Sequence, residues 1–81
     1  MSYSNPPGEF SVCQFFPDGA YKYTRRFVSA AEAVNAFDHY THSVGARLGM
    51  TVRVIVTDGG DNTNMEWEFG KGITFPKKEP V

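Results

Sequence analysis

A single amphipathic segment in the middle of the chain constrains the fold more than any other feature of the sequence. Ser29 and Glu32 have the spacing of a helix capping box, in which the serine hydroxyl accepts a bond from a helical amide and the glutamate reaches back. Gly49 suits the position just after a helix C-terminus. Apolar residues recur at helical spacing between these signals: Ala30, Ala33, Val34, Phe37, Tyr40, Val44 and Leu48. We therefore predict one helix over Ala30–Leu48.

The residues before this helix have the pattern of a β-hairpin. Phe10–Phe16 is a short apolar, β-prone run, and Tyr21–Val28 alternates between apolar and polar side chains. The Pro-Asp-Gly sequence at 17–19 lies between them, and each of its residues suits its position in a tight turn. Two antiparallel strands are therefore expected here.

The residues after the helix repeat this layout. Thr51–Thr57 is rich in β-branched residues, and Met65–Phe69 alternates between apolar and acidic side chains. Turn residues fill positions 58–62 between the two segments. Ile73–Phe75 is either a fifth short strand or a continuation of the fourth beyond a bulge.

The order strand, strand, helix, strand, strand predicts a single α+β domain of the ββαββ type. We expect a four-stranded or five-stranded, mostly antiparallel sheet with the helix packed on one face. If the second and third strands are neighbours, a right-handed crossover pairs them in parallel. We place this domain at residues 9–76, after a flexible lead-in at 1–8 and before a tail at 77–81.

The alternation of the strands assigns their side chains to two faces of the sheet. We expect the face against the helix to carry Val12, Tyr21, Tyr23, Phe27, Val52, Val54, Val56, Met65, Trp67 and Phe69. We expect the opposite, open face to carry Cys13, Phe15, Lys22, Arg26, Val28, Arg53, Ile55, Glu66 and Glu68.

The composition argues against several classes of protein. A single cysteine, Cys13, excludes an intramolecular disulfide and a cysteine-based zinc site in this chain of 81 residues. The 8 Lys and Arg residues face 9 Asp and Glu residues, which argues against a strongly basic nucleic-acid binder. The sequence has no export signal and no long apolar run, so we expect a cytoplasmic protein that makes no membrane contact.

Two polar clusters are weak candidates for chemistry. Asp38, His39 and His42 have a helical spacing that suits a metal site or a small metal-dependent enzyme, although a solvated helix face is favoured. The acidic turn after Asp58 departs from a calcium loop because Gly60 stands where an acidic ligand belongs. Because no catalytic motif is present, we expect no catalytic residues, no cofactor and no enzymatic activity.

The segment containing Tyr21, Tyr23, Arg25 and Arg26 interleaves aromatic and basic residues. Sheets that bind single-stranded RNA stack bases on such aromatic side chains. The expected position of the two tyrosines in the core and the net charge both argue against this function. A single-stranded nucleic-acid-binding module therefore stands as an alternative hypothesis.

The leading hypothesis is a small non-enzymatic regulatory protein that acts through protein–protein contacts, as a homodimer. Apolar side chains on an otherwise polar, open sheet face indicate a partner. One specific form of this hypothesis is that the protein is an inhibitor encoded by a mobile genetic element. The predicted interaction surface consists of Phe15, Ile55, Val28, Arg26, Arg53, Glu66 and Glu68.

Overall fold

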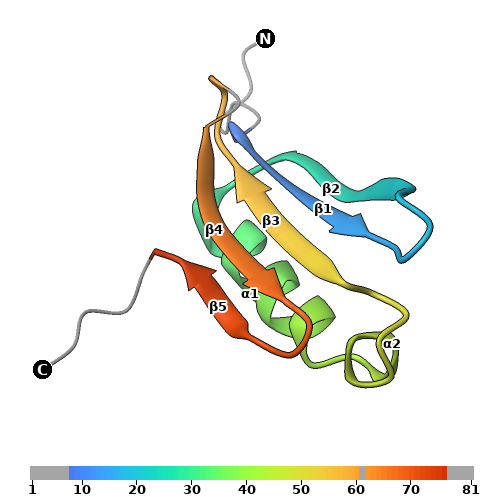
Figure 1. Cartoon of the computed structure of the whole chain (residues 1–81). Helices are drawn as coiled ribbons and strands as arrows, with labels where there is room; N and C mark the ends of the chain where they lie inside the picture. Colours follow the sequence, from blue (N-terminus) through green and yellow to red (C-terminus); the bar gives the residue numbers. More distant parts are fainter. Residues whose placement is uncertain (1–7, 61, 77–81) are drawn as a thin grey trace, which may run out of the picture.

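The computed structural model describes residues 8–60 and 62–76, which form one sheet with a helix against it (Figure 1). The residues expected to form the tail, and all but Gly8 of the expected lead-in, lie outside the described residues. The elements are β1 (Phe10–Phe15), β2 (Tyr21–Val28), α1 (Ala30–Thr41), α2 (Val44–Arg47), β3 (Arg53–Thr57), β4 (Thr63–Glu68) and β5 (Gly72–Phe75).

The five strands form one antiparallel sheet in the order β2-β1-β3-β4-β5. The sheet and its one main helix confirm the α+β class, and β5 is a strand in its own right. Because β1 lies between β2 and β3, the second and third strands are not neighbours and no parallel pair forms. The middle strand of the sheet is β3.

The main helix begins where the sequence predicts and ends earlier. The Ser29 hydroxyl accepts a hydrogen bond from the Glu32 amide at 3.2 Å, which is half of a capping box. The predicted continuous helix to Leu48 is wrong, because α1 ends at Thr41. The Ser43 hydroxyl accepts from the Ala46 amide at 3.2 Å and caps the short helix α2. A serine that bonds to the backbone in this way competes with helix continuation.

The core lies between α1 and the central strands. Its buried residues are Val12, Ala33, Ala36, Phe37, Val54 and Val56, with Phe10, Val28, Tyr40, Met65 and Trp67 packed against them. The expectation that Val54, Val56, Met65 and Trp67 face the helix is therefore confirmed. Cys13 is buried on the other side of β1, and burial raises the pKa of its thiol.

The expected position of three aromatic residues in the core is wrong. Tyr21 is 62% exposed, Phe27 is 56% exposed and Tyr23 is 38% exposed. The β1–β2 register pairs Phe15 with Tyr21 and Cys13 with Tyr23. Directly opposed residues of an antiparallel pair project to the same side, so both tyrosines lie on the open face.

The pairing register of β2 and two irregularities in it account for further corrections. Val12 pairs with Arg25 whereas Cys13 pairs with Tyr23, which leaves Thr24 as an extra residue in a β-bulge. A second irregularity lies between the pairs Val12–Arg25 and Phe10–Val28, and beyond it Val28 packs against the core, so its predicted place on the open face is wrong. Lys22 was also expected on the open face but lies on the helix side, because it pairs with Gln14.

The helix covers only part of the sheet. It packs against β1, β2 and β3 (Figure 1). A five-stranded sheet is roughly 20–25 Å wide, whereas a helix with its side chains is about 10–12 Å across. The helix side of β5 is therefore left uncovered by α1, and that of β4, where Met65 and Trp67 are half-buried, is only partly covered. None of the helices in the described part of the chain has the length and apolar character needed to cross a membrane.

Candidate functional site

The first candidate site is the open face, by which we mean the side chains that project from the sheet away from α1. They are Cys13, Phe15, Tyr21, Tyr23, Arg26, Arg53, Ile55, Glu66, Glu68 and Phe75. This face brings together every residue of the predicted interaction surface except Val28. It also carries Tyr21 and Tyr23, which the sequence analysis placed in the core.

Aromatic rings and arginines form one continuous cluster on the β1–β2 side of the open face. The ring centroids of Phe15 and Tyr21 are 5.8 Å apart, and those of Tyr21 and Tyr23 are 6.2 Å apart in an edge-to-face arrangement. The Arg26 guanidinium lies 4.2 Å from the Tyr23 ring centroid, and the Arg53 guanidinium lies 5.5 Å from that of Phe15. These are cation–π distances, so Arg26 and Arg53 each interact with a ring of the cluster.

The positively and negatively charged side chains of the open face lie on different strands. On β3 and β4, Arg53 Nε lies 2.8 Å from a Glu66 carboxylate oxygen and Arg53 Nη2 lies 3.8 Å from Glu68. On β2, Arg26 has no carboxylate within 4.0 Å among the described residues. Glu68 also lies 3.6 Å from Lys71 Nζ, so within the described part of the chain the face carries a free positive charge at β2 and two carboxylates with cationic neighbours at β4.

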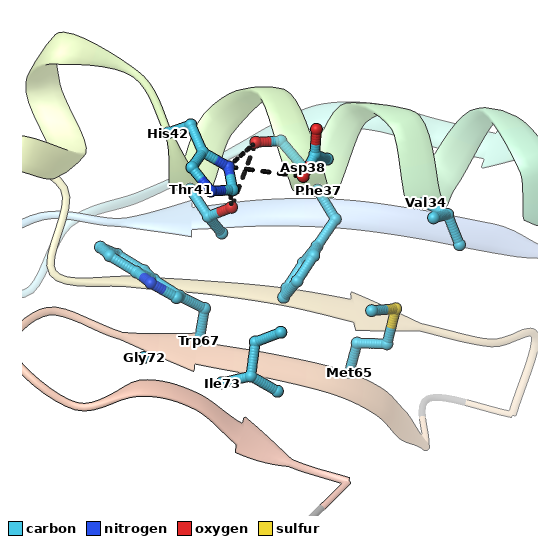
Figure 2. A pocket seen from close by; sticks show the side chains of 9 residues that line it. All are labelled: Val34, Phe37, Asp38, Thr41, His42, Met65, Trp67, Gly72 and Ile73. Atoms are coloured by element: carbon cyan, nitrogen blue, oxygen red, sulfur yellow. Dashed lines mark hydrogen bonds and ion pairs between the residues drawn. The ribbon is translucent and has the colours of Figure 1, made fainter.

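The second candidate site is an apolar cleft between α1 and strands β4 and β5 (Figure 2). Its volume is about 320 Å³. The residues that line it are Val34, Phe37, Asp38, Thr41, His42, Met65, Trp67, Gly72 and Ile73. The side chains of Met65, Trp67 and Ile73 rise from the strands toward the helix in Figure 2. Sequence reasoning missed this cleft, because it depends on how far α1 extends across the sheet.

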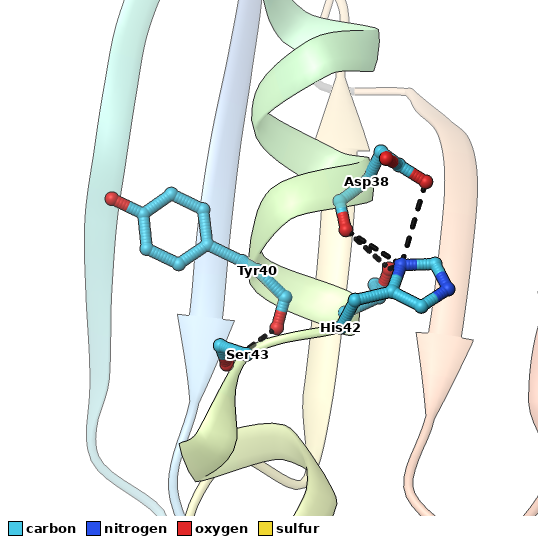
Figure 3. A network of polar contacts seen from close by, with 5 residues as sticks. Asp38, Tyr40, His42 and Ser43 are labelled. Carbon is cyan, nitrogen blue, oxygen red and sulfur yellow. Dashed lines mark hydrogen bonds and ion pairs between the residues drawn. The ribbon is translucent and has the colours of Figure 1, made fainter.

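A small polar network forms the helix side of this cleft (Figure 3). The His42 Nδ1 atom lies 2.8 Å from the Asp38 carbonyl oxygen and 3.4 Å from its carboxylate. Because a carbonyl oxygen only accepts, the Nδ1–H group donates this hydrogen bond to the Asp38 carbonyl oxygen. Thr41 Oγ1 donates to the same carbonyl oxygen at 3.1 Å. The network thus fixes His42 against the last turn of α1.

The predicted metal-site candidate is not assembled. The His39 ring packs edge-on against Tyr40, with 4.9 Å between centroids, and takes no part in the Asp38–His42 network. Within residues 8–60 and 62–76, no group of three His, Cys, Asp or Glu side chains is arranged to hold a metal ion. The helical spacing therefore brings Asp38 and His42 together but leaves His39 apart from them.

The turn after β3 is organised by the Asp58 carboxylate. Its Oδ1 atom accepts hydrogen bonds from the Asn62 amide at 3.1 Å and from the Gly60 amide at 2.9 Å. The bond from the Asn62 amide is the largest cause that lowers the pKa of Asp58, and bonds from Asn64 and Gly60 add to it. Asp61 lies outside the described residues. The oxygen-rich turn is thus explained by its own backbone hydrogen bonds.

We expect acidification to loosen this turn. The pKa of Asp58 is below its ordinary value of 3.8, so its contribution to folding is present above that pH and is lost as the pH falls through the lowered pKa. A titration of the Gly60 amide chemical shift should therefore have a midpoint below 3.8, and Asp58→Asn should remove the transition. A midpoint at or above 3.8 would contradict the hydrogen bonding described above.

Comparison of the chain with protein-family models, curated proteins and solved structures gives no match. The function must therefore be inferred from the two sites themselves.

Proposed function

We propose that this protein is a non-enzymatic binding protein that forms a homodimer through its open face. The observation that carries the proposal is the aromatic cluster of exposed Tyr21 and Tyr23 and half-buried Phe15, with Arg26, on a sheet face away from the helix. Aromatic residues and arginine are enriched at protein interfaces and at their energetic hot spots. Apolar patches on a polar surface are typical of contact sites.

The charges of the open face suit a second copy of the same chain. In a symmetric dimer, residue i contacts residue j and residue j contacts residue i. A two-fold axis that passes near Ile55 of β3 and is inclined to the strands would bring the Arg26 end of β2 in each copy over β4 of the other. Arg26 of each copy would then face Glu66 and Glu68 of the other, and Ile55 would meet its own copy at the axis. Such complementarity favours one orientation over others.

A second candidate function is supported by the exposure of Tyr21 and Tyr23. The sequence-based objection that these rings lie in the core no longer holds. Single-stranded nucleic acid stacks on exposed aromatic side chains, but it also needs a basic groove for the phosphates. The open face instead carries two arginines and two glutamates, and Arg26 already lies over the Tyr23 ring. We therefore prefer the protein partner.

A titration of labelled single-stranded RNA and DNA at low salt distinguishes the two candidates. Fluorescence anisotropy that shows micromolar binding, weakened by added salt, would support the nucleic-acid function. The homodimer proposal expects no such binding.

The orientation of the proposed dimer is tested by reversing one charge. We expect Arg26→Glu to weaken self-association by about tenfold or more, because it sets a third carboxylate against Glu66 and Glu68. Sedimentation velocity from low-micromolar to millimolar concentration measures the change. Lys22→Glu is the matched control, since it makes the same charge change on the same strand but on the helix side of the sheet.

Two results would contradict this proposal. A native protein that sediments as a monomer at millimolar concentration would exclude the homodimer. An equal loss of association in Arg26→Glu and Lys22→Glu would show that net charge, not the contact between β2 and β4, controls association.

A further inference from the structure

The apolar cleft is a second surface, separate from the open face and on the other side of the sheet. Its floor is formed by Met65, Trp67 and Ile73, and its wall by Val34 and Phe37 of α1 (Figure 2). Ile73 is 56% exposed although its neighbours in the cleft are apolar. The volume of about 320 Å³ lies at the small end of the range of roughly 300–1,000 Å³ typical of small-molecule sites.

The rim of the cleft carries negative charge. Asp38 is the carboxylate among the lining residues, and no lysine or arginine lines the cleft. Asp38 and His42 also lie at the C-terminal end of α1, where the carbonyl ends of the helix carry partial negative charge. Both features favour a cationic group at this end of the cleft and disfavour an anionic one.

The length of the cleft further defines its occupant. The lining residues run from Val34 of α1 to its C-cap His42, which corresponds to about 12 Å along a helix. We propose that the cleft binds a small amphipathic amine, whose apolar body contacts Trp67 and Ile73 and whose ammonium group pairs with the Asp38 carboxylate. This binding activity is independent of the proposed dimer, because it uses the other side of the sheet.

The single tryptophan of the chain reports directly on the proposed ligand, because Trp67 lines the cleft. Three probes of similar size and different charge test it: hexylammonium, hexanol and hexanoate. We expect a saturable change in Trp67 emission with hexylammonium, an affinity about fivefold weaker for hexanol, and weaker binding still for hexanoate. The Gly72 amide chemical shift gives a second measurement at the same site.

Single substitutions distinguish the contribution of the ligand's ammonium group to binding from that of its apolar body. Asp38→Asn should weaken hexylammonium binding by about fivefold and leave hexanol binding unchanged. Glu32→Gln is the matched control, because it removes the same charge from the other flank of α1, where Glu32 pairs with Arg25. Val34→Phe should fill the cleft and weaken both ligands.

The proposal is overturned by any of three results. The first is equal affinity for the three probes, and the second is unchanged hexylammonium binding in Asp38→Asn. The third is the absence of a saturable response from both Trp67 and Gly72. An effect of Glu32→Gln equal to that of Asp38→Asn would also overturn it, because a general loss of negative charge would then explain the result.

Discussion

Replacement of Phe37 with alanine is expected to lower the free energy of unfolding by about 3–5 kcal/mol. Phe37 is 3% exposed and is the one aromatic residue among the fully buried members of the core. It projects from α1 onto the central strands, where Val12 and Val54 are also buried. A domain of 81 residues has a total stability of roughly 4–12 kcal/mol. The variant should therefore lose a large share of its folded population.

Urea denaturation followed by circular dichroism measures this loss. Tyr21→Ala is the matched control, because it also removes an aromatic ring but from a side chain that is 62% exposed. We expect the control to change the free energy of unfolding by less than about 1 kcal/mol in dilute, monomeric protein. Equal losses in the two variants would show that Tyr21 belongs to the core, as the alternation of β2 alone suggests.

Replacement of Ile55 with aspartate is expected to weaken the proposed self-association by at least about 30-fold. Ile55 lies at the centre of the open face, on the middle strand of the sheet. In the proposed dimer the substitution would bury two carboxylates against each other at the two-fold axis, without cationic partners. Truncation or charging of a central interface residue costs about 2–4 kcal/mol, which corresponds to a loss of affinity of at least about 30-fold.

Sedimentation velocity at matched concentrations checks this expectation, and urea denaturation confirms that the monomer remains folded. Ile73→Asp is the control, since it introduces the same charge at an exposed isoleucine on the helix side of β5. Unchanged association in Ile55→Asp would place the interface elsewhere. Loss of association in Ile73→Asp alone would point to the helix side of β4 and β5.

Local signals account for the parts of the fold that the sequence predicts well. The turn at 17–19, the turn at 58–62 and the Ser29 cap each act over a few residues, so the strands and the start of α1 are predictable from neighbouring residues. The end of α1 was mispredicted because two local signals compete there. Apolar spacing continues through Val44 and Leu48, but the Ser43 hydroxyl caps a new helix.

The sites were harder to predict, because they depend on contacts between distant residues. Six of the seven residues predicted for the interaction surface do share the open face. The seventh, Val28, is brought to the helix side by the second irregularity of β2, between the pairs Val12–Arg25 and Phe10–Val28, which no local pattern marks. The apolar cleft could not be predicted, since its residues come from α1, β4 and β5 and meet only when the helix lies off-centre on the sheet.

The sequence by itself determined the class of fold, the approximate limits of its strands and the first turns of its helix, because turn residues, alternation and capping act locally. The tertiary structure alone decided which side of the sheet Tyr21, Tyr23 and Val28 occupy, and with it the character of both candidate sites. The physical reason is the two-residue period of a strand. A single extra residue, or a different pairing register, moves the side chains that follow from one face to the other.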